Sequence, residues 1–181
     1  MIYGKRIRLR KVERADLPRF VEWFNDPEVR RGVSMFLPIS GDEETAWYEA
    51  MLKRPQEERA LAVELREGES WRLVGNTGLF EFDWIARCAE FGLAIGDKSV
   101  WGQGIGTEVT RLVLQHGFET LNLKRIFLRV FANNPGAMRA YEKAGYVLEG
   151  RLRKHHFSHG QYVDVLLMGV LREEWEAARD A

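Results

Sequence analysis

Three glycines at alternate positions, Gly102, Gly104 and Gly106, constrain what this chain can fold into more than any other feature. The residues before them, 89–95, read as a strand, and residues 108–121 place apolar side chains on one face of a helix. In a turn between a strand and a helix, missing side chains let backbone amides point at an anion, and the helix dipole favours negative charge. The segment therefore favours a phosphate ligand. A tight turn that needs glycine only for its dihedral angles remains the alternative.

The spacing G-x-G-x-G separates this turn from two common nucleotide-binding loops. The dinucleotide fingerprint has the spacing G-x-G-x-x-G, and the nucleotide-triphosphate loop continues with a lysine and a serine or threonine. Here Thr107 and Glu108 follow the third glycine. The turn is therefore neither of these two loops.

The periodicity of the whole chain predicts a single α+β domain over residues 1–181. Helical spacing and end signals predict helices at 17–24, 40–53, 108–121 and 134–144, with Asp16 as the first N-cap and Gly145 as the last C-cap. Alternating patterns predict strands at 7–12, 60–65, 71–84, 89–95, 125–132, 146–157 and 161–171. Residues 27–32 are expected to form a turn. The prediction is thus about seven strands and about four helices, with an antiparallel meander between 60 and 95.

Composition narrows the possible partners. The 181 residues contain 27 basic and 27 acidic side chains, so the formal net charge is zero and nucleic acid is not the expected partner. A single cysteine, Cys88, excludes an intramolecular disulfide. We find no apolar run of membrane-spanning length and no signal core, so we expect a soluble, cytoplasmic protein.

The segment 99–150, SVWGQGIGTEVTRLVLQHGFETLNLKRIFLRVFANNPGAMRAYEKAGYVLEG, resembles the coenzyme-binding half of the GNAT acetyltransferase superfamily. It is most similar to the branch that holds ribosomal-protein N-terminal acetyltransferases and spermidine acetyltransferases. The resemblance implies transfer of an acetyl group from acetyl-CoA to an amine in a ternary complex. It also implies a twisted, mixed and mostly antiparallel sheet, splayed between its fourth and fifth strands to admit the pantetheine arm.

The resemblance also implies which residues bind the coenzyme. Residues 101–107 match the family's diphosphate turn, except that Trp101 stands where relatives carry glutamine or arginine. The residues implied are Trp101, Gly102, Gln103, Gly104, Ile105, Gly106 and Thr107 at the diphosphate, and Leu93, Ala94, Ile95, Asn133, Asn134 and Ala137 along the pantetheine.

Catalytic groups follow from the same resemblance. Tyr141 matches the tyrosine that donates a proton to the departing thiolate, and a phenol and a thiol have compatible pKa values. The alternative for Tyr141 is a ring that only packs on the sheet. Arg129 occupies the position of the glutamate base of ribosomal-protein relatives, so the base is Glu81, Glu90 or water. Both glutamates lie in predicted strands, where a solvent-facing position is the alternative.

The acceptor amine is less constrained. Phe36 and Leu37 precede Pro38 where spermidine acetyltransferases carry an acidic pair, which favours an apolar entrance. A peptide N-terminus, a polyamine or another small amine therefore stays open, and a homo-oligomer is compatible with the family. His155 and His156 would point to opposite faces of a strand, so we expect no metal site. A non-catalytic acyl-CoA-binding regulatory module is the rival hypothesis.

Overall fold

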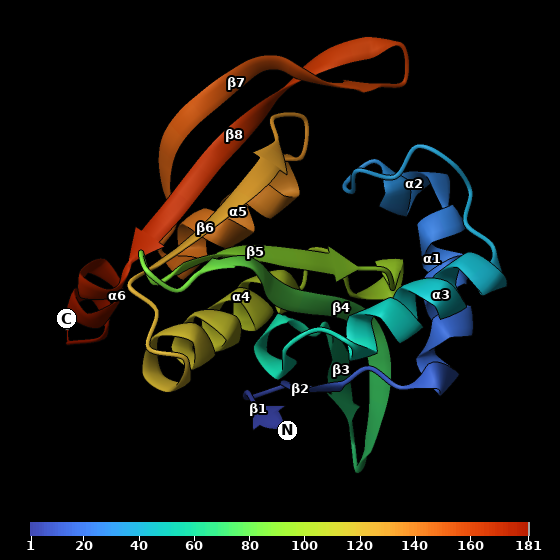
Figure 1. The fold of residues 1–181 in the computed structure, drawn as a ribbon, viewed down its shortest axis with the longest axis horizontal. Coiled ribbons are helices and arrows are strands. Elements are labelled where there is room, and N and C mark those ends of the chain that lie inside the picture. Colours follow the sequence, from blue (N-terminus) through green and yellow to red (C-terminus); the bar gives the residue numbers. More distant parts are fainter. Residues whose placement is uncertain (181) are drawn as a thin grey trace.

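An eight-stranded sheet in the order β1-β2-β3-β4-β5-β6-β8-β7 forms the centre of the molecule (Figure 1). The structure is a computed structural model and describes residues 1–180. The strands are β1 (Ile2–Tyr3), β2 (Ile7–Lys11), β3 (Leu61–Glu67), β4 (Ser70–Asp83), β5 (Cys88–Ile95), β6 (Arg125–Phe131), β7 (Val147–Ser158) and β8 (Gln161–Leu171). The α-helices are α1 (Leu17–Asn25), α2 (Pro27–Arg30), α3 (Gly41–Leu52), α4 (Ile105–Gln115), α5 (Pro135–Ala144) and α6 (Arg172–Asp180). Short 3-10 turns lie at Arg14–Asp16, Gln56–Glu58 and Lys98–Val100, and a π turn at His116–Thr120 extends α4.

The predicted α+β class and the mixed, mostly antiparallel sheet are confirmed, but the number of elements was too low. The sequence pattern does not predict the short edge strand β1 or the helix α6. The turn expected at 27–32 is wrong, because residues Pro27–Arg30 form the helix α2. Asp26 causes this difference: its side chain accepts hydrogen bonds from the backbone N–H groups of Glu28 and Val29, and so caps the short helix.

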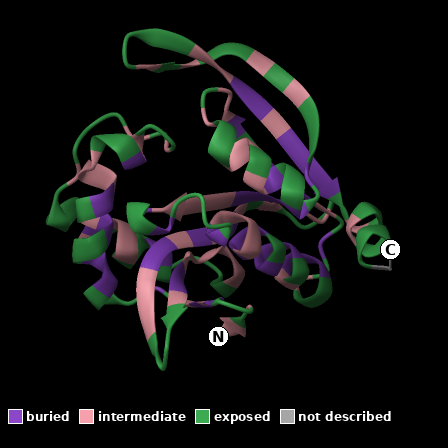
Figure 2. Ribbon diagram, turned by 180° about the vertical axis from the view of Figure 1, so that it is seen from behind, coloured by how far each residue is buried: buried purple, intermediate pink, exposed green. Residues whose placement is uncertain are grey.

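Helices cover the two faces of the sheet and make two cores. On one face α4 and α5 pack around residues such as Phe91, Val109 and Phe118. On the other face α1 and α3 enclose a smaller core around Phe20 and Trp23. Figure 2 shows the buried residues concentrated in the central strands, while the far end of the β7–β8 hairpin is exposed. Each face of the sheet therefore has its own core, and an opening in the sheet would connect the space on one face with the space on the other.

That opening lies between β5 and β6, which form the sheet's parallel pair. The pairing joins Cys88 to Arg125, Ala89 to Ile126 and Glu90 to Phe127, and extends no further. Beyond Glu90, β5 continues paired to β4 alone, and β6 continues paired to β8. The splay expected between the fourth and fifth predicted strands is confirmed here, as β5 and β6 (Figure 1).

Within residues 1–180, none of the helices is long and apolar enough to cross a membrane.

Candidate active site

A groove of about 1190 Å³ runs through the splay. One end is lined by the glycine turn, the start of α4 and the inner side of α5. The other end is lined by α1, the residues that follow it and parts of β4, β6 and β7. The groove therefore offers two compartments that meet between β5 and β6, which suits a reaction between two molecules that enter from opposite sides.

The glycine turn forms the first compartment. Gly102 and Gly104 have φ angles of +74° and +79°, in the left-handed region that favours glycine. Gly104 is the N-cap residue of α4. Within residues 1–180, the backbone N–H groups of Gly104 and of Ile105, Gly106 and Thr107 have no backbone acceptor, whereas Gln103 donates a long bond to the Val100 carbonyl. Four free amides at a helix start form a cradle for an anion.

Arg6, in the segment between β1 and β2, holds this turn in place. Its Nη1 donates to the Gln103 carbonyl at 3.1 Å, and its Nε donates to Glu108 Oε2 at 2.8 Å. The Glu108 carboxylate would otherwise repel an anion from the first turn of α4. Its ion pair with Arg6 offsets that negative charge and fixes the turn to the N-terminal strands.

Trp101 lines the groove beside the glycine turn, and its indole also braces that turn. Its Nε1 donates to the Ile95 carbonyl at 2.8 Å. This hydrogen bond ties the turn to the end of β5.

The free edge of β5 leads from the turn to the splay. Gly96 N–H donates to the Val74 carbonyl of β4, so by strand alternation the N–H groups of Leu93 and Ile95 point away from β4. No β6 residue pairs with them in the described sheet. An extended ligand could therefore add to this edge like another strand, with Ala94 facing the second compartment.

The start of α5 forms the opposite wall. Asn134 Oδ1 accepts the Ala137 N–H at 3.1 Å and so caps the helix. The side-chain amide nitrogen of Asn134 lies close to Gly32, 3.2 Å from the position that a Cβ on that glycine would take. This nitrogen is the part of Asn134 that could bind a ligand. Asn133 and Ala137 line the groove beside it. The lining also includes Arg139 and Lys143, two cations that the sequence reading did not single out.

Tyr141 of α5 lines the groove beside Phe91 of β5, next to the point where the splay begins. Its ring is 8% exposed and packs edge-on against Phe91, with the ring centroids 6.1 Å apart. Burial raises the pKa of Tyr141 to about 12. The phenol therefore stays protonated and is available to a ligand.

Glu90, Arg129 and Glu81 form a charge cluster where the splay begins. Arg129 Nε and Nη2 bind the two carboxylate oxygens of Glu90 at 2.9 and 2.5 Å, and the Glu90 side chain is 5% exposed. These hydrogen bonds raise the pKa of the Arg129 guanidinium. Glu81 is 3.5 Å from Arg129 Nη2 and is 62% exposed. The structure thus brings both predicted carboxylates to one arginine, one buried and one at the rim.

Glu81 reaches that rim because the strand is irregular. The β4–β5 register shifts between Phe80 and Asp83, and Glu81 has a φ of +51°. The bulge reverses the alternation, so Phe80 lines the groove while Phe82 packs on the main core. Phe80 and Phe82 therefore do not share one face, although a regular strand would place them together.

Aromatic rings line the second compartment. The His156 ring stacks on Phe131 at 4.0 Å and lies 5.8 Å from Phe36. Phe80 lies over Gly92, where a Cβ would come within 2.6 Å of its ring. The sequence reading named Phe36 but missed Phe131, because nothing in the local pattern places β6 beside the residues after α2.

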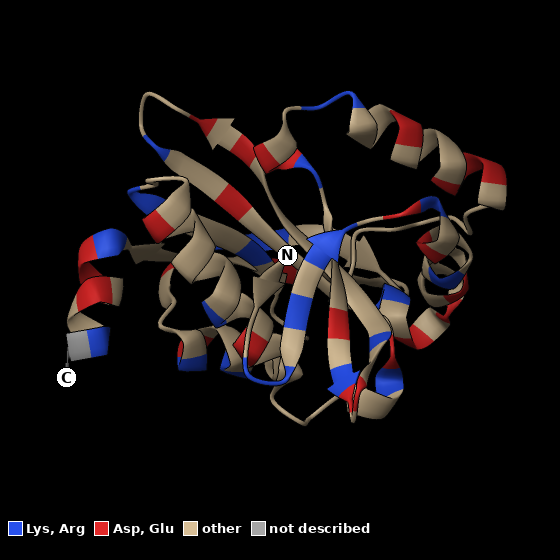
Figure 3. Cartoon of the chain, turned by 90° about the horizontal axis from the view of Figure 1, so that it is seen from below, with Lys and Arg blue, Asp and Glu red and all other residues tan. Residues whose placement is uncertain are grey.

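Charge on the surface is mixed. Figure 3 shows acidic and basic residues interleaved over the molecule. In the second compartment Glu28 pairs with Lys98, and Glu90 pairs with Arg129. Within residues 1–180, no group of three or more histidine, cysteine or acidic side chains is placed to hold a metal ion.

Comparison with known proteins identifies the family. Residues 6–147 match the model of the GNAT acetyltransferase domain. The chain is 30% identical to the spermidine N(1)-acetyltransferase of Vibrio cholerae, over 95% of this chain and 96% of the relative. It is 25% identical to a putative ribosomal N-acetyltransferase of Bacillus subtilis, over 97% of each.

A solved structure agrees with the sequence relatives. The crystal structure of Vibrio cholerae spermidine N-acetyltransferase in complex with CoA and spermine matches with a TM-score of 0.86 and 30% identity, over 96% of this chain and 99% of that one. The predicted acetyl-CoA-dependent N-acetyltransferase activity, with acetyl-CoA as co-substrate, is thereby confirmed at the level of the family. The chain belongs to the GNAT acetyltransferase family.

Proposed function

We propose that this enzyme acetylates a primary amine that has an apolar neighbouring group and no chain of further positive charges. The observation that supports this most is the groove itself, in which a diphosphate cradle and an aromatic compartment meet at Tyr141. Acetyl-CoA would enter from the side of α4 and α5. The amine would enter from the side of α1 and the residues after α2.

Each element of the first compartment has a role in this proposal. The free amides from Gly104 to Thr107 bind the diphosphate, and Arg139 and Lys143 add positive charge nearby. The edge of β5 pairs with the pantetheine, and the Leu93 N–H stabilises the oxygen on which negative charge develops. The two contacts together hold the thioester at the splay.

Attack by the amine expels the coenzyme as a thiolate. Tyr141 Oη donates its proton to that sulfur, which makes it a better leaving group. Its burial fits this role, because the raised pKa of Tyr141 keeps the phenol protonated over the physiological range.

The amine must be neutral before it attacks the thioester, so its ammonium form first loses one proton. The nitrogen releases a second proton after attack, when the amide forms. Both oxygens of Glu90 are engaged by Arg129, so we assign Glu90 to holding that arginine in place. Glu81 is exposed and adjoins the same guanidinium. We assign it to receiving the proton through water in the groove.

The charge balance of the second compartment supports a monoamine. A polyamine would be favoured by an excess of carboxylates, whereas here Glu28 and Glu90 are paired with cations. The third carboxylate of the lining, Glu58, shares it with Arg31 and Arg54. Phe36, Phe131 and His156 instead offer flat apolar surface. An N-terminal amine of a peptide, or an aromatic monoamine, fits this lining better than spermidine.

The test is a panel of acceptors with acetyl-CoA, read as thiol release and as acetylated product. The panel contains phenethylamine, short peptides with an N-terminal alanine or serine, amino acids, aminoglycosides, spermidine and spermine. We expect kcat/KM for a monoamine or a peptide to exceed that for spermidine at least tenfold. A preference for spermidine would refute the acceptor class. Coenzyme binding without thiol release for any acceptor would favour the non-catalytic module.

A further inference from the structure

The end of α5 holds two tyrosines together. The sequence Tyr141-Glu142-Lys143-Ala144-Gly145-Tyr146 ends the helix with Gly145 at a φ of +106°. Tyr146 N–H donates to the Tyr141 carbonyl at 3.0 Å, and Gly145 N–H donates to the Glu142 carbonyl. This pair of bonds is the Schellman motif, which places the residue after the glycine against the side chain five positions earlier.

The two phenol rings are accordingly in contact. Their centroids are 5.9 Å apart, and both rings pack on Phe91, at 6.1 and 6.3 Å. Tyr141 borders the groove, whereas Tyr146 does not. Tyr146 therefore lies directly behind the proposed proton donor, on the side away from the substrates.

The Tyr146 hydroxyl is buried without a hydrogen-bond partner among the described residues. The residue is 3% exposed, and its Oη is the one fully buried side-chain nitrogen or oxygen in residues 1–180 without a hydrogen-bond partner. A buried hydroxyl without a partner destabilises a folded protein, and phenylalanine would fill the same space without that cost. Packing alone therefore does not account for tyrosine at this position.

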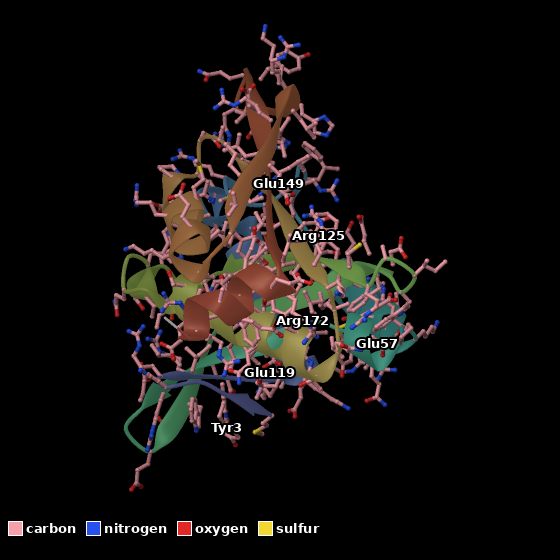
Figure 4. All side chains as sticks on the ribbon, turned by 90° about the vertical axis from the view of Figure 1, so that its left-hand side faces the viewer. Tyr3, Glu57, Glu119, Arg125, Glu149 and Arg172 are labelled. Atoms are coloured by element: carbon pink, nitrogen blue, oxygen red, sulfur yellow. The ribbon has the colours of Figure 1, made fainter. Side chains whose placement is uncertain are left out.

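Charges around Tyr146 are few. Arg125 of β6 is the nearby cation, and it is bound by Glu149 of β7 across Gly169. Figure 4 labels Arg125 and Glu149, which come from β6 and β7 on either side of β8. No carboxylate contacts the Tyr146 hydroxyl among the described residues, so its free proton is available to a neighbour that becomes negative.

We propose that Tyr146 is a positioning residue for Tyr141: its hydroxyl donates a hydrogen bond, directly or through one water, to Tyr141 Oη when that oxygen loses its proton. This inference rests on the proposed role of Tyr141 as the proton donor. The proton that leaves Tyr141 forms the S–H bond of CoA, and the negative charge stays on Tyr141 Oη. The Tyr146 proton stays on Tyr146. Tyr141 is then reprotonated by the proton that the acetylated amine releases, so the cycle balances.

The test is a double-mutant cycle of Tyr141→Phe and Tyr146→Phe, with Tyr162→Phe as a control at an exposed tyrosine of β8. We expect Tyr141→Phe to lower kcat about 100-fold and Tyr146→Phe about tenfold, with the Kd for CoA unchanged in both. In the Tyr141→Phe background, Tyr146→Phe should cost nothing further, because it acts through the hydroxyl already removed.

Stability gives an independent readout. Removing a buried hydroxyl without a partner should raise the Tm of Tyr146→Phe by about 2–6 °C, while its kcat falls. Tyr162→Phe should change neither quantity. A Tyr146→Phe variant that keeps the parent kcat, whatever its Tm, would overturn this inference and leave the role of Tyr141 intact. A Tyr141→Phe variant with the parent kcat would refute the proposed acid itself.

Discussion

Replacing Gly104 by alanine tests the diphosphate cradle, and the chain offers a matched control at Gly68. Both glycines have positive φ angles, +79° and +61°. A Cβ at Gly104 would have Arg6 Nη2 as its nearest neighbour, at 3.6 Å, and a Cβ at Gly68 would have none within 4 Å. Neither substitution therefore clashes, and each costs the ~1–2 kcal/mol of a left-handed conformation. Gly104 caps α4, whereas Gly68 lies in the hairpin between β3 and β4.

The two variants should lose similar stability, with Tm lowered by about 2–8 °C. Only Gly104→Ala should weaken coenzyme binding, because relief of the strain turns the next amides away from the diphosphate. Loss of one charge-assisted hydrogen bond of about 1.5–3 kcal/mol raises the Kd for CoA roughly 10- to 100-fold. Isothermal titration calorimetry and thermal melts measure both quantities. Equal Kd values for Gly104→Ala, Gly68→Ala and the parent would show that the turn does not bind the diphosphate.

Three further predictions concern single side chains. Because the pKa of Tyr141 is raised to about 12, kcat should not fall between about pH 8 and pH 10 in a pH–rate profile; a decline there that Tyr141→Phe abolishes would contradict the assignment. Glu81→Gln should lower kcat/KM about tenfold, with little change in Tm because its carboxylate is exposed. The control Glu69→Gln should change neither kcat/KM nor Tm. Equal kinetics for Glu81→Gln and the parent would remove Glu81 from the proton path. Burial lowers the pKa of His116 below its unfolded value, so the folded state disfavours the protonated ring. The free energy of unfolding that His116 contributes is therefore present above about pH 6.5 and is lost as the pH falls through the folded pKa. Thermal melts of His116→Gln should show a weaker decline of Tm from about pH 7 to pH 5 than the parent, and identical slopes would refute this cause.

The fold was predictable where local pattern and tertiary structure agree. The strand–turn–helix around Gly104 appears as expected, because positive φ angles and a helix start both select for glycine there. The splay followed from the family resemblance. Periodicity alone could not predict it, since pairing between β5 and β6 stops after Glu90 while both segments continue as strands.

The candidate site was predictable only in part, for reasons that can be located in the structure. Glu81 sits on a bulge that breaks strict alternation, so its direction could not be deduced from a period of two. The stack of Phe36, His156 and Phe131 joins three elements distant in the chain. The sequence does not separate Tyr146 from an ordinary core tyrosine, and only the absence of a partner for its hydroxyl among residues 1–180 distinguishes it.

A crystal structure of the protein with bound CoA would locate each part of the coenzyme in the groove. We expect the diphosphate oxygens within hydrogen-bond distance of the N–H groups from Gly104 to Thr107, the pantetheine along the free edge of β5, and the sulfur beside Tyr141 Oη. Coenzyme bound at another place, or bound here with its sulfur remote from Tyr141, would contradict this expectation.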